Sequence, residues 1–162
     1  MTFSSSRPED LLFDAARKGD VASLKEVLAT GIDVNTQNGN GFTPLTLSSY
    51  EGHLEATKWL LENNANVNAQ DFAGNSALMG VCFKGHGEVA RFLIQHGADL
   101  NLQNSTGSTA LMFATMFGQN EMVKILVESG ADLSVKDARG LTALDLAHQQ
   151  GNTEVLQYLQ KP

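Results

Sequence analysis

Cysteine is almost missing from this chain of 162 residues, in which Cys82 stands alone. A single cysteine excludes an intrachain disulfide and a metal site built from several thiolates. Long apolar runs are missing as well: the first ten residues lack the apolar stretch of a secretion signal, and no later stretch approaches the length of a membrane span. We therefore expect a soluble cytoplasmic protein that makes no contact with membranes.

Positive charge is also scarce. Eleven Lys and Arg residues are outnumbered by eighteen Asp and Glu residues, which gives a formal net charge of −7. An acidic surface repels phosphate backbones, so we expect no nucleic acid partner. Apolar residues make up 42% and aromatic residues 7% of the chain, and this composition, at this length, is typical of one globular domain.

The glycines are spaced regularly along the chain. Two sets have members 33 residues apart, namely Gly41, Gly74, Gly107 and Gly140, and Gly19, Gly52, Gly85, Gly118 and Gly151. A third set, Gly31, Gly97 and Gly130, has Asn64 in the missing place, and Asn adopts positive φ at low cost, which predicts a left-handed residue after a helix. Two apolar columns keep the same interval, namely Leu12, Leu45, Leu78, Leu111 and Leu144, and Val27, Leu60, Leu93, Leu126 and Leu159. The chain therefore consists of five copies of one unit.

The second copy shows what each unit contains. Thr43 and Pro44 form a helix start, because Thr is a competent N-cap and Pro is tolerated at the first helical position. We expect this helix to reach about Tyr50 and a second helix to cover residues 54–61, where apolar residues recur at a spacing near 3.6. The stretch 65–74 is rich in Asn, Asp and Gly, which indicates a projecting turn or hairpin.

These units resemble the ankyrin repeat, with its period of 33 and its Thr-Pro-Leu-His pattern, at Gly41-Phe-Thr-Pro-Leu and at Gly97-Ala-Asp-Leu-Asn. The resemblance implies an all-α solenoid of five stacked helix-turn-helix repeats with projecting β-hairpin or turn loops and a concave binding face. We expect a tail over residues 1–7 and a single repeat domain over residues 8–160. Its repeats would cover about residues 8–37, 38–70, 71–103, 104–136 and 137–160.

The chain departs from the family pattern at two columns. The His of the Thr-Pro-Leu-His motif is replaced by Thr46, Met79, Met112 and Asp145, so the hydrogen bond that this His makes in the family is missing. The Pro of the motif is present only as Pro44, and Ala takes its place at the equivalent position of the following repeats. We expect a softer stack than in a consensus array.

No constellation typical of catalysis or cofactor binding stands out. His53 and His86 are one repeat apart at the Gly-His position of the ankyrin pattern, which indicates a structural role. Cys82 falls in a column of small residues and is expected to pack rather than react. The carboxylates recur with the repeat and do not pair as an acid and a base. We therefore predict a protein that is not an enzyme, with no catalytic residue, no metal site and no cofactor.

The residues that the fold leaves free are the candidates for partner binding. They lie at the hairpin tips and at the exposed ends of the first helices: Phe42, Tyr50, Glu51, Phe72, Asn75, Phe83, Lys84, Ser108, Met116, Phe117, Arg139 and Leu141. Exposed aromatic groups often dominate binding energy, so Tyr50, Phe72, Phe83 and Met116 carry most weight. Phe42 and Phe117 flank buried columns and could instead fold back onto their neighbours. We expect Trp59, Phe92, Ile125 and Tyr158 to form a core between repeats.

Two functions remain open at this point. The first is a protein-binding adaptor or inhibitor, such as an immunity-type binder, that grips one folded protein and is itself a monomer. The chain is similar to small stand-alone ankyrin repeat proteins of bacteria, which include catalase partners and toxin neutralisers. The second open function is therefore that of a catalase-associated accessory protein that handles haem, with Tyr50, Cys82, His86 or Met116 as an iron ligand.

Overall fold

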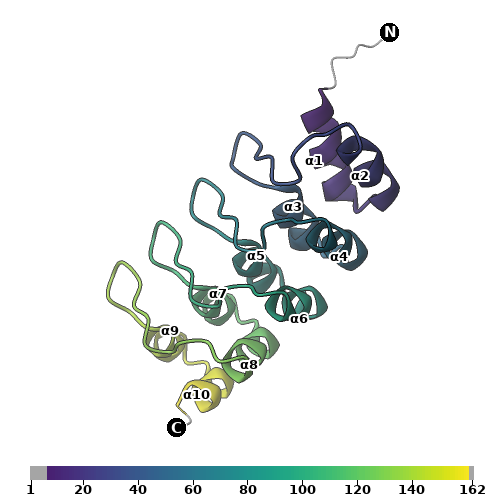
Figure 1. The fold of residues 1–162 in the computed structure, drawn as a ribbon. Coiled ribbons are helices and arrows are strands. Elements are labelled where there is room, and N and C mark those ends of the chain that lie inside the picture. Colours follow the sequence, from purple (N-terminus) through teal and green to yellow (C-terminus); the bar gives the residue numbers. More distant parts are fainter. Residues whose placement is uncertain (1–6, 161–162) are drawn as a thin grey trace.

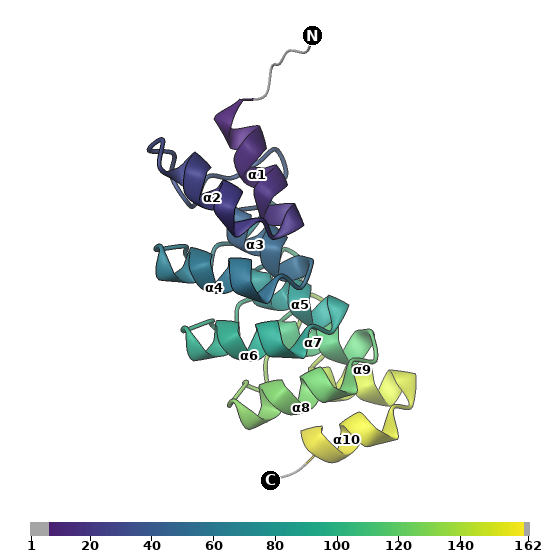
Figure 2. The ribbon, with the colours of Figure 1, turned by 90° about the vertical axis from the view of Figure 1, so that its right-hand side faces the viewer.

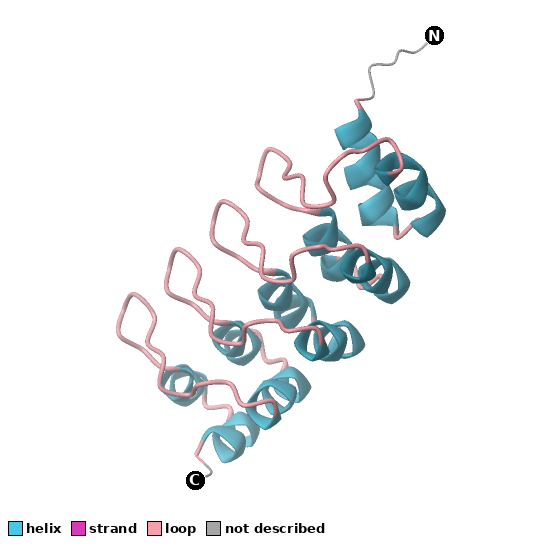
Figure 3. Ribbon diagram, in the orientation of Figure 1, coloured by secondary structure: helices cyan, strands magenta, loops and turns pink. Residues whose placement is uncertain are grey.

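The computed structural model describes residues 7–160. Within these residues the secondary structure is helical, and the single strand-type pairing is an isolated antiparallel bridge between Gln70 and Ser76 (Figure 3). The helices are α1 (Pro8–Lys18), α2 (Val21–Leu28), α3 (Pro44–Tyr50), α4 (Leu54–Glu62), α5 (Ala77–Lys84), α6 (Gly87–Gln95), α7 (Ala110–Met116), α8 (Asn120–Glu128), α9 (Ala143–Gln150) and α10 (Thr153–Leu159). Apart from Arg7, the predicted tail lies outside the described residues.

The helices form two rows. Helices α1, α3, α5, α7 and α9 stack in one row, helices α2, α4, α6, α8 and α10 stack in the other, and the loops before α3, α5, α7 and α9 project to one side (Figure 1). A view turned by 90° shows the successive helix pairs one above another, with the N-terminal and C-terminal pairs at opposite ends of the stack (Figure 2). The prediction of an all-α solenoid of five stacked helix pairs is confirmed.

The helix boundaries follow the local sequence signals. Helix α3 starts at Pro44 behind the N-cap Thr43, and the next helix ends before Asn64, whose φ is 74°. The predicted left-handed residue is therefore confirmed. Thr46 replaces the family's His, and its hydroxyl accepts a hydrogen bond from the Thr43 backbone N–H at 2.8 Å. Asp145 accepts the corresponding bond from the Thr142 N–H at 2.9 Å, so both helix starts keep a capping box without the His.

The core lies between neighbouring repeats. Both apolar columns are buried, including Leu12 and Leu159 in the terminal repeats, except that Val27 in the first repeat and Leu144 in the last are half-buried. The small column, which contains Ala15-Ala16, Ser48-Ser49, Val81-Cys82 and Ala114-Thr115, is also buried and lets the first helices approach closely. Trp59, Phe92, Ile125 and Tyr158 were expected to form a core between repeats. Ile125 is buried, but Trp59, Phe92 and Tyr158 are half-buried at the edge of the stack.

Polar bridges hold each projecting loop to the next. Gln37 donates from Nε2 to the carbonyl oxygens of Gly41 and Gln70, at 3.1 and 3.2 Å, and Gln70 and Gln103 repeat this pattern one and two repeats later. Backbone bonds join the same loops, as from the Phe72 N–H to the Asn40 carbonyl at 3.1 Å. These bridges align the loops side by side along the stack.

A second column of bridges holds the first helices together. The ring nitrogen Nε2 of His53 lies 2.8 Å from the Arg17 carbonyl oxygen, and that of His86 lies 3.0 Å from the Tyr50 carbonyl oxygen. In the next repeat Gln119 Nε2 donates to the Phe83 carbonyl at 2.9 Å. A carbonyl oxygen can only accept, so each His must carry its proton on Nε2. These His residues act in the packing of repeats.

Candidate functional site

The loop-side face, formed by the exposed side of α3, α5 and α7 and by the loops before them, carries the exposed aromatic residues. Tyr50 is 39% exposed, Phe83 is 38% exposed and Phe117 is 50% exposed. Tyr50 and Phe83 are equivalent positions of α3 and α5, and Phe117 is the C-cap residue that follows α7. Phe72, at a loop tip, is 71% exposed.

The rings of Tyr50, Phe83 and Phe117, which we call the aromatic row, lie next to one another across three repeats. The Tyr50 and Phe83 ring centroids are 6.3 Å apart with the planes at 6°, and the Phe83 and Phe117 centroids are 4.7 Å apart with the planes at 87°. Phe113 stacks behind Phe117 at 6.3 Å. Offset and edge-to-face contacts at these distances are favourable, so the rings form one continuous apolar surface.

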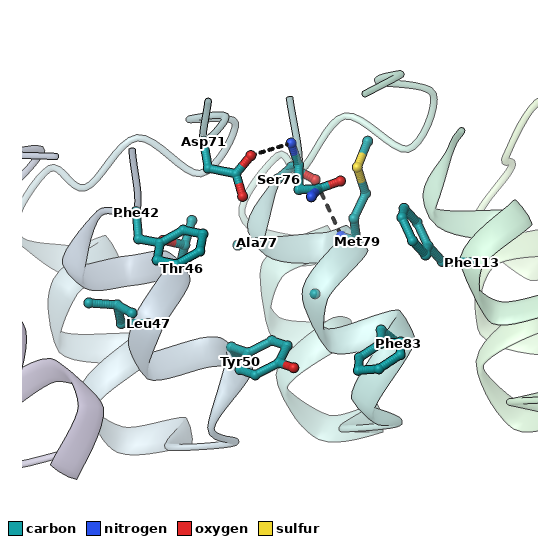
Figure 4. Close-up of a pocket in the computed structure, with 12 residues that line it drawn as sticks. Phe42, Thr46, Leu47, Tyr50, Asp71, Ser76, Ala77, Met79, Phe83 and Phe113 are labelled. Carbon is teal, nitrogen blue, oxygen red and sulfur yellow. Dashed lines mark hydrogen bonds between the residues drawn. The ribbon is translucent and has the colours of Figure 1, made fainter. Parts of the chain in front are cut away.

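A groove of about 410 Å³ opens beside this row, between α3, α5 and α7. Its walls are mostly apolar and include Phe42, Leu47, Tyr50, Met79, Phe83 and Phe113 (Figure 4). Its polar lining includes Thr46 of α3 and Ser76 at the start of α5, and Asp71 and Asn75 of the loop before α5. A volume of this size and an apolar lining are typical of sites that receive one large side chain or a small ligand.

Gly80 forms the floor of the groove in the middle of α5. The equivalent positions of the neighbouring repeats hold Leu47 and Phe113, so the missing side chain leaves a gap between two large ones. A Cβ placed at Gly80 would lie 3.2 Å from the Tyr50 ring, which shows how closely that ring approaches α5. Glycine inside a helix is about 0.5–1 kcal/mol less favourable than alanine, and here it creates a hollow.

Charge is sparse around the groove. Lys84 places its Nζ 4.9 Å from the Tyr50 ring centroid, a cation–π geometry, and Glu51 is exposed next to Tyr50. At the loop end the Asp71 carboxylate accepts hydrogen bonds through Oδ1 from the backbone N–H groups of Ala73 and Asn75, at 2.9 and 2.8 Å. Lys84 and Glu51 therefore lie near Tyr50, and the Asp71 carboxylate lies at the loop end of the groove.

The other predicted partner-binding residues have different surroundings. Phe42 is half-buried in the groove wall, and Met116 and Leu141 are half-buried against the core. Ser108 is 7% exposed, with its hydroxyl 3.1 Å from the Thr106 hydroxyl, so it offers little contact surface. Arg139 is exposed, and its guanidinium pairs with Asp137 in the last loop.

The structure therefore brings together six of the twelve predicted residues, which are Phe42, Tyr50, Asn75, Phe83, Lys84 and Phe117, and joins Glu51 to their edge. Sequence reasoning missed Gly80, Asp71, Leu47 and Phe113. The signal for Gly80 was present as a single glycine in a column that holds Asp14, Leu47, Phe113 and Leu146 in the other repeats. The signal for Phe113 was a ring in that same column, where no other repeat has an aromatic residue.

The residues considered as iron ligands do not form a common site. Cys82 is fully buried in the core, and burial raises the pKa of its thiol. His86 uses its Nε2 on the Tyr50 carbonyl. Across residues 7–160 there is no group of three His, Cys, Asp or Glu side chains placed to hold a metal ion, and no helix there is long and apolar enough to cross a membrane.

Stacked helix pairs with aligned loops and an exposed apolar surface define a helical repeat scaffold, and the comparison with known families identifies which one. Residues 12–104 and 97–162 match the family described as ankyrin repeats in three copies. The chain belongs to the ankyrin repeat family, whose members are generally protein–protein interaction modules.

One relative illustrates how local the similarity to other proteins is. A protein of Medicago truncatula named Protein VAPYRIN-LIKE is 42% identical over 54 residues. The aligned part is 33% of this chain and 12% of the relative. The chain therefore matches about an eighth of that protein's length, which amounts to less than two repeats of the 33-residue period.

Proposed function

We propose that this chain is a non-enzymatic protein-binding module, an adaptor or inhibitor, that grips one folded protein with a concave surface of hairpin tips and first helices. The observation that carries the proposal is the aromatic row with the groove beside it. Three exposed rings in mutual contact form an apolar surface that helix and loop formation do not require. Binding by occupancy needs no reacting group on the module.

The composition of the surface supports the same proposal. Protein interfaces place aromatic residues at their centre and few charged residues there, with polar groups at the rim. Here the rings of Tyr50 and Phe83 form the centre, while Glu51 and Lys84 lie beside them. Aromatic residues in such positions commonly contribute 2 kcal/mol or more, about thirtyfold in affinity, when they are truncated to alanine.

Affinity capture of partner proteins from a lysate of the source organism, with the wild type and two variants as bait, tests the proposal. The wild type is compared with Tyr50→Ala/Phe83→Ala, which removes the centre of the aromatic row. Phe92→Ala is the matched control, because it removes a half-buried ring that lies on α6 in the other helix row and stacks on His96. All three proteins are first shown to have equal helicity by circular dichroism.

We expect one protein to be retained by the wild type and by Phe92→Ala and lost by the double variant. Retention of the same protein by all three would show that another surface binds, and the site would then be wrong. The proposal also includes a monomer that works in the cytoplasm. Sedimentation should give the mass of one chain, and a dimer dissociated by Phe83→Ala would contradict it.

A further inference from the structure

One Asx column organises every projecting loop. Asn38, Asp71, Asn104 and Asp137 occupy equivalent positions, and the Oδ1 of each accepts the backbone N–H groups two and four residues later, at 2.8–3.0 Å. Two repeats use Asn for this purpose and two use Asp. The loop therefore requires one oxygen, and the second oxygen of an Asp is free for another role.

In the last loop that second oxygen has a partner. Arg139 Nη2 lies 3.1 Å from Asp137 Oδ2, and the carboxylate is almost completely buried beneath it. The equivalent of Arg139 in the loop before α5 is Ala73, which is exposed. Its side chain carries no charge, so it cannot pair with Asp71 as Arg139 pairs with Asp137. Within residues 7–160, Asp71 receives hydrogen bonds on Oδ1 and makes no ion pair.

The unpaired oxygen of Asp71 belongs to the groove. Asp71 lines the groove, and Figure 4 shows one carboxylate oxygen on the bond to the loop backbone and the other turned away from that bond. The same groove contains the hollow above Gly80, between the large side chains of Leu47 and Phe113. An apolar hollow next to an uncompensated carboxylate is complementary to a large apolar side chain beside a cation.

We infer that the groove takes a segment of the partner protein that inserts one large aliphatic or aromatic side chain above Gly80 and pairs an arginine with Asp71. The arginine reproduces in trans the bond that Arg139 makes to Asp137. Arginine fits better than lysine because its planar guanidinium can reach two acceptors at once. The net charge of −7 favours the approach of a cationic segment. This inference rests on the proposed function and specifies the partner's chemistry.

The charges also orient the segment. Lys84 occupies the far side of Tyr50, where its Nζ is held over the ring, and it repels a second cation there. An arginine paired with Asp71 at the loop end avoids this repulsion, and the apolar side chain then lies between it and the aromatic row. An arginine within about four residues of the apolar side chain can reach Asp71 from this position, since an extended chain spans about 3.3 Å per residue.

The probe for this inference is a phage-displayed library of random 12-residue peptides, selected on the wild-type protein. The strongest selected peptide is then synthesised, and its affinity for purified variants is measured by fluorescence anisotropy. Asp71→Asn keeps the loop, because Asn38 and Asn104 make the same turn. Ala73→Arg places on the chain the cation that the last loop already carries, so it competes with the peptide's arginine for Asp71.

A matched control separates the local pair from net charge. Asp99→Asn removes one charge from another loop column, where Asn66 makes the same bond to the backbone N–H two residues later. We expect selected peptides to share a large apolar residue with an arginine within four positions. Asp71→Asn and Ala73→Arg should each weaken binding about tenfold, whereas Asp99→Asn should change it less than twofold.

The other outcomes separate the two proposals. Apolar peptides without arginine, or equal affinity for the wild type and Asp71→Asn, would overturn this inference, and a loss with Phe83→Ala would still support the binding surface. Selected peptides that bind Phe83→Ala as tightly as wild type would overturn the surface itself. Failure to enrich any peptide would refute recognition of a linear segment. A dimer in sedimentation that Phe83→Ala dissociates would make a second copy the occupant instead.

Discussion

The contact between successive loops can be tested with a pair of alanine substitutions. Gly107 and Gly140 occupy the same column and have nearly the same φ, +78° and +82°. They differ in their surroundings, because a Cβ at Gly107 would lie 2.7 Å from the backbone N of Ala138, whereas a Cβ at Gly140 would meet nothing within 4 Å. The last loop has no following loop against it, so this pair isolates the effect of stacking.

The two substitutions share one cost and differ in another. Alanine at positive φ destabilises the folded state by about 1–2 kcal/mol at either position. At Gly107 the added carbon must also displace the next loop, which carries the bond from the Ala138 N–H to the Thr106 carbonyl at 2.9 Å. Losing that bond adds about 1 kcal/mol, and the backbone shift adds to it. Gly107→Ala should therefore be less stable than Gly140→Ala by about 1–2 kcal/mol.

Urea and thermal unfolding followed by far-ultraviolet circular dichroism measure the difference. For a chain of this size it corresponds to about 2–8 °C in Tm. Gly74→Ala should behave like Gly107→Ala, because its Cβ would lie 2.9 Å from the Asn104 Cα. Equal losses for Gly107→Ala and Gly140→Ala would refute the reasoning and show that the loops do not press against one another in solution.

Three further predictions concern single side chains. His86→Ala should lower stability by about 1 kcal/mol in urea unfolding, whereas His86→Gln should retain most of it, since Gln119 makes the same bridge. Cys82 should resist a thiol reagent such as Ellman's reagent in the folded protein and react with one equivalent after unfolding, because it is fully buried and burial raises its pKa. Backbone N–H groups, that of Leu141 above all, and Arg139 hold the pKa of Asp137 below its usual 3.8, so its contribution to stability is present above that value and is lost as pH falls through the lower folded-state pKa. The decrease of Tm between pH 5 and about pH 2 should therefore be smaller in Asp137→Asn, and an identical decrease in both proteins would contradict this assignment.

The period, the helices and their ends followed from the sequence alone. Thr43, Pro44 and Asn64 act on backbone conformation within a few residues, so their effects can be inferred without knowing the tertiary structure. The burial of the leucine columns could also be predicted from the sequence, because a 33-residue period places equivalent side chains in equivalent surroundings. The same reasoning identified the exposed columns that hold Tyr50 and Phe83.

What only the tertiary structure decided is how neighbouring repeats share space. The groove exists because Gly80 lies between Leu47 and Phe113, three residues that are far apart in the chain. Ser108 was predicted to be accessible and is buried, at 7% exposure, in the stacked structure. Asp71 and Asp137 have the same residue type and the same turn, but of these two only Asp137 forms an ion pair among residues 7–160. Periodicity determines which positions are equivalent, whereas exposure, cavities and charge pairing depend on the differences between the side chains that stacking brings into contact.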